Sequence, residues 1–132
     1  MKITADTNVL VRAIVGDDAA QARVAQAELA RAETIVLTLP TLCELVWVLA
    51  QGYKIAPVRI AQTVERLADS ANVVLNRPAL DAGLSMLRAG GDFADGVIAY
   101  EGHWLGAEVF VSFDRKAVKL LQAQSRSARL PG

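Results

Sequence analysis

The sequence is poor in the residues that build covalent and metal cross-links. It has one cysteine, Cys43, and one histidine, His103, among 132 residues. A lone cysteine excludes an intrachain disulfide framework, and one residue of each kind is too few for a four-ligand zinc site. Lysine plus arginine (14) balance aspartate plus glutamate (14), so no net positive charge points to a nucleic-acid partner. The most apolar stretch, residues 35–50, is too short to cross a membrane and contains Pro40 and Glu44.

Composition and the N-terminal segment narrow the class of protein further. Asp6 precedes any apolar run, so the N-terminal segment does not have the form of a signal peptide. Hydrophobic residues make up 53% of the chain, which is enough for the core of one domain. No linker, repeat or low-complexity segment divides the sequence. We therefore expect a single domain over residues 1–132 and a cytoplasmic localisation.

Short apolar runs alternate with longer segments of helical periodicity along the chain. Helices are expected over residues 7–15, 17–31, 40–49, 60–68, 80–87, 93–105 and 117–121. Short strands are expected at residues 3–5, 34–38, 72–75 and 109–111, and residues 128–130 could add an edge strand. This alternation predicts an α/β fold with four or five short strands in a largely parallel central sheet flanked by helices.

Acidic residues stand near the ends of several expected strands. Asp6 directly follows the first strand, and Asp114 comes shortly after the 109–111 strand. Asp92 and Asp95 lie in the turn that opens the next-to-last helix, and Glu44 lies about one turn into the helix after the second strand. Because the carboxyl ends of parallel strands share one edge of a sheet, the sequence predicts that these carboxylates meet there.

Carboxylates that converge without a cation between them would repel one another by about a few kcal/mol. A bound cation removes this repulsion, and hard oxygen ligands select Mg²⁺ or Mn²⁺ rather than zinc. A divalent ion held in this way can polarise a phosphodiester and activate water. The acidic pattern therefore favours metal-dependent phosphodiester chemistry.

Each of these carboxylates also has a purely structural explanation. Asp6 and Asp114 are equally well explained as N-caps of the helices that follow them. Asp92 stands three residues before Asp95, which is the spacing of a capping box, so a cap explains it better than a metal ligand does. The helix dipole stabilises the negative charge of Asp95 in the first helical turn without any metal, and Glu44 could simply face water.

A few other residues carry expectations of their own. Asp17 and Asp18, like the remaining acidic residues, are expected on solvated helix surface. His103 is expected to be partly exposed and not to act as a catalytic base, and Cys43 to be a small buried hydrophobic residue. Trp47 lies on a helix that is apolar almost all round, so part of that helix is expected to meet a second subunit or a partner helix.

The motifs, taken in order, resemble those of the PIN-domain family. Residues 6–10 (DTNVL) are similar to the opening of a PIN domain, and residues 39–44 (LPTLCE) to its second motif. Residues 93–99 (FADGVIA) look like the helix with the third acidic residue, and residues 111–114 (VSFD) like the last motif. The resemblance covers essentially the full length, at the size of the VapC-type toxins of bacterial toxin–antitoxin pairs.

This resemblance implies a PIN-like nuclease domain whose parallel sheet has the strand order 3-2-1-4-5. It implies a Mg²⁺- or Mn²⁺-dependent endoribonuclease that acts on RNA as a toxin, forms a homodimer and is held by a cognate antitoxin. The implied site residues are the acidic quartet Asp6, Glu44, Asp95 and Asp114, of which Asp6, Asp95 and Asp114 bind metal, with Asp92 as an accessory ligand or a cap, and Asn8 and Ser112 as polar neighbours that orient the carboxylates.

Contacts to RNA and one departure from the family pattern complete this interpretation. Arg12 follows the first motif, and Arg115, Lys116 and Lys119 follow the last one, so these four could bind phosphates. A plain solvated helix face explains the last three nearly as well. Gly96 stands where the family usually has alanine, and glycine weakens a helix by about 1 kcal/mol relative to alanine, so we expect a looser helix there.

Two other classes of function stay open at this point. A phosphoryl-transfer receiver fits less well, because it needs an aspartate after a central strand and a lysine near the last strand, where this chain has Asn76 and Ser112. A haloacid-type phosphatase needs two aspartates that flank one residue after the first strand, and Asn8 stands in place of the second. A non-catalytic binding module on the same fold would use the same elements without metal chemistry. Only an assay of metal-dependent RNA cleavage separates this module from a nuclease.

Overall fold

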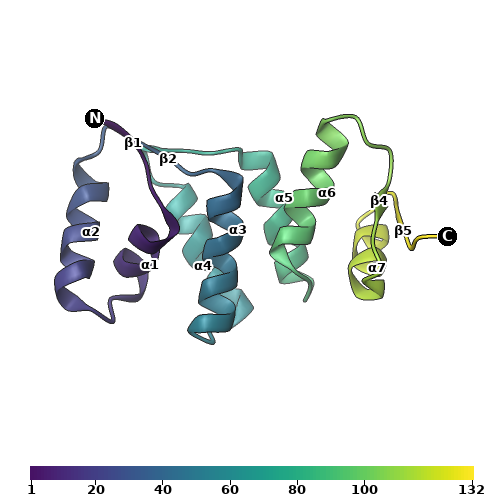
Figure 1. Ribbon diagram of the computed structural model, residues 1–132, viewed down its shortest axis with the longest axis horizontal. Helices are drawn as coiled ribbons and strands as arrows, with labels where there is room; N and C mark the ends of the chain where they lie inside the picture. Colours follow the sequence, from purple (N-terminus) through teal and green to yellow (C-terminus); the bar gives the residue numbers. More distant parts are fainter. The chain divides into compact units, whose positions relative to one another are not determined.

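The computed structural model describes residues 1–132 and has an α/β architecture of seven α-helices, one π-helix and five short strands, all paired in parallel. The chain divides into two compact units, Met1–Asn76 (unit 1) and Arg77–Gly132 (unit 2). Figure 1 labels the seven α-helices and the strands β1, β2, β4 and β5 of the two units. No helix is long and apolar enough to span a membrane.

Unit 1 contains a three-stranded parallel sheet in the order β1-β2-β3. Its strands are β1 (Lys2–Thr4), β2 (Thr34–Val36) and β3 (Val73–Val74). Ile3 is paired with Ile35, and Ile35 with Val73. The ladder extends past β1, because the Ala5 N–H donates to the Val36 carbonyl at 3.4 Å. The β-branched runs of the sequence therefore form the sheet, with Ile35 only 3% exposed.

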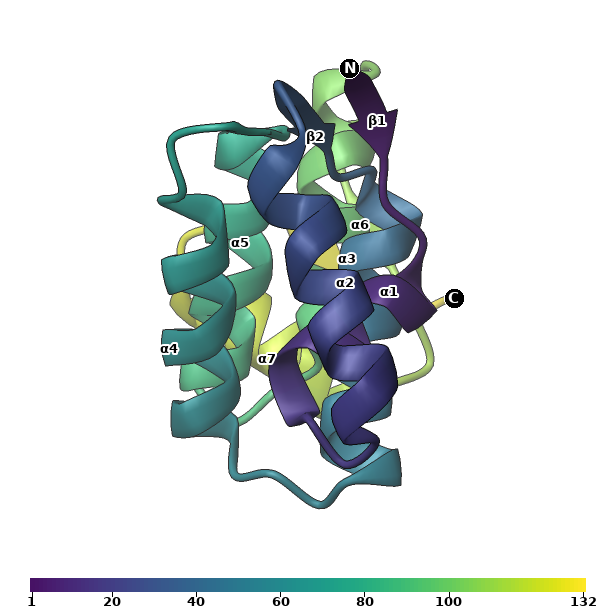
Figure 2. The ribbon, with the colours of Figure 1, turned by 90° about the vertical axis from the view of Figure 1, so that its left-hand side faces the viewer.

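The helices of unit 1 are α1 (Thr7–Val15), α2 (Ala19–Arg31), α3 (Leu39–Trp47), the π-helix η1 (Val48–Gly52) and α4 (Pro57–Ala68). Helix α1 packs against both α2 and α3, and Figure 2 shows α1, α2 and α3 with strands β1 and β2. Helix α2 begins later than predicted, because Asp18 is its N-cap and accepts from the Gln21 N–H at 3.1 Å. Asp17 therefore lies in the turn between α1 and α2.

The predicted helix after the second strand is present, but its last turn is a π-helix. Leu42, Leu45 and Val46 are buried in α3, as their spacing predicts, and Leu49 is buried in η1. The backbone then widens, because the Tyr53 N–H donates to the carbonyl of Val48, five residues earlier, at 3.2 Å. Single π-helical turns are rare and occur frequently at functional sites.

Unit 2 is built from α5 (Arg77–Arg88), α6 (Phe93–Trp104), β4 (Phe110–Val111), α7 (Arg115–Ala123) and β5 (Ala128–Arg129). The possible edge strand at residues 128–130 is confirmed, since β5 pairs in parallel with β4. Met86, Val118, Leu121 and Ala128 form the centre of a hydrophobic cluster in this unit. Amphipathic helices thus cover the small sheet of unit 2.

The predicted continuous strand order 3-2-1-4-5 is wrong in one respect. The order β3-β2-β1 is confirmed, but β4 and β5 form a separate two-stranded sheet. The physical reason is that β4 forms its ladder with β5 inside unit 2, with Phe110 opposite Ala128 and Val111 opposite Arg129, and no ladder joins β4 to β1.

Gly96 has a packing role that contradicts the expectation of a looser helix. Helices α5 and α6 pack closely, and a Cβ at Gly96 would lie 2.3 Å from the Ala82 carbonyl oxygen. A Cβ at Gly83 would lie 2.7 Å from the Phe93 ring. The two glycines therefore permit a close approach of α5 and α6, and the favourable packing offsets the poor helix propensity of glycine.

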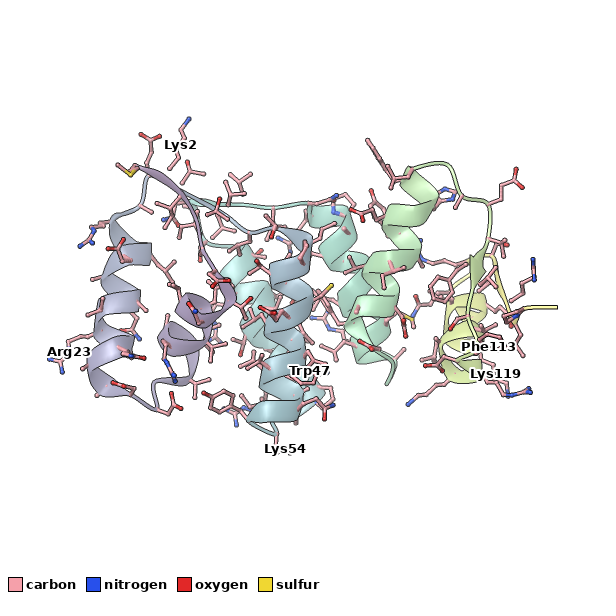
Figure 3. The ribbon with its side chains drawn as sticks, in the orientation of Figure 1. Lys2, Arg23, Trp47, Lys54, Phe113 and Lys119 are labelled. Carbon is pink, nitrogen blue, oxygen red and sulfur yellow. The ribbon has the colours of Figure 1, made fainter.

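Three other side chains have clear surroundings. Trp47 is 64% exposed, so this large apolar side chain of α3 is left outside the core, and Figure 3 labels it beside that helix. His103 is exposed, as predicted. The expectation for Cys43 is wrong, since this residue is half-buried and lies between the buried face of α3 and its exposed face.

Candidate active site

Asp6 stands where β1 passes into α1. The residue has extended backbone geometry and is the N-cap of α1, with its Oδ1 accepting from the Thr7 N–H at 2.8 Å. Its carbonyl oxygen accepts from the N–H groups of Val9 and Leu10, which begins the helical hydrogen bonding. The capping explanation is therefore confirmed for Asp6. It occupies Oδ1 and leaves Oδ2 without a hydrogen bond.

Glu44 and Asp6 line the same cavity in unit 1. The cavity has a volume of about 260 Å³, and its lining residues are Asp6, Thr7, Asn8, Val11, Arg12, Glu44, Val48 and Tyr53. Glu44 reaches it from the exposed face of α3, while Leu42 and Leu45 fill the buried face of the same helix. Two predicted site carboxylates and the predicted polar neighbour Asn8 thus meet in one hollow, together with Arg12.

Thr7 is a lining residue of this cavity that the sequence pattern did not single out. It is 5% exposed and the one buried polar residue of the chain. Its Oγ1 is buried without any hydrogen-bond partner. A buried hydroxyl that lacks a partner costs about 1–3 kcal/mol. Thr7 thus combines a place in the cavity lining with a buried hydroxyl whose hydrogen-bonding capacity is unused.

Arg12 is held by a carboxylate from outside the cavity lining. Its Nη1 lies 3.3 Å from Asp17 Oδ1, and the Tyr53 hydroxyl donates to Asp17 Oδ2 at 3.0 Å. Arg12 forms its ion pair with Asp17 and not with Asp6 or Glu44. Asp17 is exposed, as predicted, but it lies in a turn and not on a helix, and both of its carboxylate oxygens have partners. Tyr53 and Arg12 themselves line the cavity.

Unit 2 brings its own carboxylates together around the start of α6. Asp92 is the N-cap of α6 and accepts from the Ala94 N–H at 3.0 Å, which confirms the prediction of a cap. Asp95 lies in the first turn of the same helix, where the helix dipole favours a negative charge. Burial raises the pKa of Asp95 above 3.8, and the nearby charges of Asp92 and Asp114 raise it further. Mutual repulsion of this kind is what a bound cation relieves.

Asp114 is held at the start of α7 by two local hydrogen bonds. Its Oδ1 accepts from the Ala117 N–H at 3.0 Å, so Asp114 is an N-cap as well. The Ser112 hydroxyl accepts from the Asp114 N–H at 3.0 Å. Ser112 therefore fixes the backbone of Asp114 and does not bind its carboxylate.

The donor chemistry of these residues fits a hard divalent cation. Each of the three capping aspartates, Asp6, Asp92 and Asp114, uses Oδ1 for its cap and keeps Oδ2 free of hydrogen bonds. Capping and metal ligation are thus compatible in one carboxylate. No group of three or more histidine, cysteine, aspartate or glutamate side chains is clustered as a metal site. Of the predicted metal ligands, Asp6 belongs to unit 1, while Asp95, Asp114 and the accessory candidate Asp92 belong to unit 2.

The predicted phosphate-binding residues of α7 are exposed and free of ion pairs. Arg115, Lys116 and Lys119 all lie on the exposed face of this helix, whose buried face carries Ala117, Val118 and Leu121. Phe113 stands just before α7 and is 85% exposed; Figure 3 labels Phe113 and Lys119 in this region. An exposed aromatic ring next to cations is a surface suited to nucleic-acid strands.

Comparison with known proteins identifies the family. A model of the family described as "PIN domain" matches residues 3–120. Searches of curated proteins and of solved structures gave no match. The matched span includes every acidic residue of the candidate site, from Asp6 to Asp114. With nearly all of its length covered by this family model, the chain belongs to the PIN-domain family.

Proposed function

We propose that this protein is a Mg²⁺- or Mn²⁺-dependent endoribonuclease. PIN domains are generally nucleases, which favours this chemistry over a receiver or phosphatase. The observation that carries the proposal is the cavity lined by Asp6 and Glu44, beside the orphaned hydroxyl of Thr7. In unit 2, the repulsion of Asp95 by Asp92 and Asp114 supports the binding of a cation among these carboxylates.

In this proposal Asp6, Glu44, Asp95 and Asp114 form the catalytic set, and Asp6, Asp95 and Asp114 bind the metal. When bound, the divalent ion supplies Lewis-acid chemistry that neutralises phosphate charge and makes water more acidic. N-cap hydrogen bonds hold Asp6 and Asp114 in fixed orientation, so these two ligands need little reorganisation. The expected reaction is hydrolysis of an RNA phosphodiester that leaves a 5′-phosphate and a 3′-hydroxyl.

The other residues have supporting roles in this proposal. Asn8 and Ser112 fix the carboxylates or their backbone, and Asp92 serves as a cap or an accessory ligand. Arg12 lies at the cavity in unit 1, where a guanidinium can bind a phosphate oxygen. Arg115, Lys116 and Lys119 provide further phosphate contacts from α7.

The decisive experiment compares two capping aspartates of unit 1. Asp6→Asn and Asp18→Asn both keep a good N-cap, because asparagine caps a helix as well as aspartate does. Only Asp6 lies in the cavity, so Asp6→Asn should lower RNA cleavage by about 100-fold or more while Asp18→Asn retains it. Cleavage of a labelled RNA would be measured with Mn²⁺, Mg²⁺ or EDTA.

The alternative of a non-catalytic binding module makes the opposite prediction. Purified protein would then cleave no RNA with either ion, and Asp6→Asn would change neither metal binding nor growth of the host cell. Equal loss of activity in both variants would contradict a specific role of Asp6 in the cavity, because both variants keep their N-caps.

We further propose that the protein acts as the toxin of a toxin–antitoxin pair, as a homodimer bound by its antitoxin. One exposed large apolar side chain on α3, Trp47 at 64% exposed, is a candidate contact for such a protein partner. Induced expression should arrest growth, and Asp6→Asn should abolish the arrest. Coexpression of an adjacent small gene that encodes a DNA-binding protein should restore growth. Growth that is unaffected by the wild-type chain would contradict this role.

A further inference from the structure

The cavity in unit 1 has a cation at its rim that is turned away from the carboxylates. Arg12 lines the cavity with Asp6 and Glu44, yet its ion pair is with Asp17 at 3.3 Å. Asp17 itself is not a lining residue. An arginine that paired with Asp6 or Glu44 would neutralise the very groups that hold a cation. The pair with Asp17 keeps the arginine near the cavity without that effect.

Asp17 also holds an aromatic side chain at the same rim. The Tyr53 hydroxyl donates to Asp17 Oδ2, across 36 positions of sequence, at 3.0 Å. Tyr53 follows the π-helix η1, whose widened turn is closed by the hydrogen bond from the Tyr53 N–H to the Val48 carbonyl. Val48 and Tyr53 both line the cavity. One carboxylate thus fixes a guanidinium and a phenol ring from two distant segments.

We propose that Asp17 is a positioning residue that holds Arg12 and Tyr53 as an RNA-strand clamp beside the Asp6–Glu44 cavity. In this clamp Arg12 binds a backbone phosphate, because the Asp17 bond uses only one of its five N–H donors. Tyr53 offers its ring to a base next to that phosphate, which is a sequence-tolerant contact. The inference rests on the proposed ribonuclease function and adds a substrate-binding element to it.

The exposure of the Asp17 contacts means that their effect on RNA binding can be measured apart from any effect on stability. The side chains of Arg12 and Asp17 are 40% and 44% exposed, and an ion pair of this exposure contributes little to stability. Loss of Asp17 should therefore leave the thermal midpoint unchanged. It should weaken strand binding, because a misplaced contact group costs about 10-fold to 100-fold.

The test measures binding and turnover separately. A short fluorescein-labelled oligouridylate would be titrated in EDTA by fluorescence anisotropy, and kcat and KM would be measured with Mn²⁺. Asp17→Asn should raise both Kd and KM by about 10-fold or more and leave kcat within about 2-fold. Asp81→Asn is the matched control, since it breaks the Arg77–Asp81 pair (3.2 Å, 43% and 58% exposed) in unit 2. That control should bind the oligonucleotide as the wild type does.

Double variants test whether the three residues act together. Arg12→Lys and Tyr53→Phe should each weaken binding in the wild type and add little in the Asp17→Asn background, because coupled residues are not additive. Wild-type affinity of Asp17→Asn, or fully additive losses, would overturn the clamp even if RNA is cleaved. Tight binding of the oligonucleotide in EDTA, together with no cleavage when Mn²⁺ is supplied, would instead reject the ribonuclease and leave the clamp in place. A wild type that binds no oligonucleotide would overturn the clamp outright.

Discussion

The two units hold the acidic residues of the candidate site in different surroundings. In unit 1, Asp6 and Glu44 line a cavity together with a cation, Arg12, and with Thr7, whose hydroxyl is buried without a partner. In unit 2, burial raises the pKa of Asp95, and the nearby charges of Asp92 and Asp114 raise it further. The difference shows two ways in which a site carries an unsatisfied interaction. Unit 1 leaves a polar atom unbonded, and unit 2 leaves like charges uncompensated.

Both features cost folding free energy, and in both units a bound ion or ligand would recover that cost. An orphaned buried hydroxyl and repelling carboxylates are the kinds of local conflict that folded proteins retain mainly at functional sites. The three N-caps add to this comparison, because Asp6, Asp92 and Asp114 have structural roles that use only one carboxylate oxygen each. A structural role therefore does not argue against a catalytic one here.

The largest effect is expected for Asp95→Asn in unit 2. This variant should lose about 100-fold or more of the RNA cleavage, since a proposed ligand is removed. It should nevertheless raise the thermal midpoint of the metal-free protein at neutral pH, because the ionised carboxylate is destabilised by burial and by Asp92 and Asp114. Glu101→Gln, an exposed change on the same helix, should alter neither property.

The same variant has a characteristic pH dependence. A folded-state pKa above 3.8 means that the native protein binds more protons than the unfolded chain between the two pKa values, so wild-type stability falls as pH rises through this window. The gain of Asp95→Asn should therefore be present at neutral pH and vanish below the ordinary pKa of aspartate. A gain that is independent of pH, in denaturant titrations across this range, would contradict electrostatic repulsion as its cause.

The next largest effect concerns the scaffold that carries Asp95. Gly96→Ala should destabilise the protein by about 1–3 kcal/mol, because the new methyl group would overlap the Ala82 carbonyl. Gly102→Ala lies in the same helix, and its Cβ would have Ala107 Cβ at 4.0 Å as its nearest neighbour. This control should stabilise by about 0.5–1 kcal/mol through helix propensity. Urea unfolding measures both, and equal effects would disprove the close packing of α5 and α6.

The smallest effect is expected for Thr7→Val in unit 1. Removal of an unpartnered buried hydroxyl should leave stability unchanged or raise it by about 1 kcal/mol, while Mn²⁺ binding and RNA cleavage weaken. Thr63→Val is the control, because the Thr63 hydroxyl already donates to the Arg59 carbonyl at 2.8 Å. Calorimetry of Mn²⁺ binding compares the two. Unchanged Mn²⁺ affinity in Thr7→Val would show that the hydroxyl takes no part in the site.

Local sequence patterns predicted most of the secondary structure and the N-caps. The spacing of Leu42, Leu45 and Leu49 predicted the helix after the second strand, and Asp92 three residues before Asp95 predicted a cap. These features depend on residues less than two turns apart, so the sequence contains all that they need. The π-helical end of that helix was not foreseen, because its signal is a single extra residue in the backbone ladder.

The contacts of Asp17 and Gly96 could not be predicted for a different reason. Asp17 is bonded to a tyrosine 36 positions away, and Gly96 is packed against a carbonyl of the preceding helix. Neither partner is marked by spacing or composition. A glycine inside a helix and an aspartate in a turn have the same local signal whether or not a partner approaches them.

The sequence by itself determined the α/β alternation, the order of the acidic motifs and membership of the PIN-domain family, because each depends on residue type and spacing along the chain. Tertiary structure alone decided that Asp6 and Glu44 share a cavity, that Thr7 is left without a hydrogen bond there, and that β4 pairs with β5 in its own sheet. These outcomes depend on which surfaces approach one another in three dimensions. Packing between distant segments sets them, and no local preference of the chain encodes such packing.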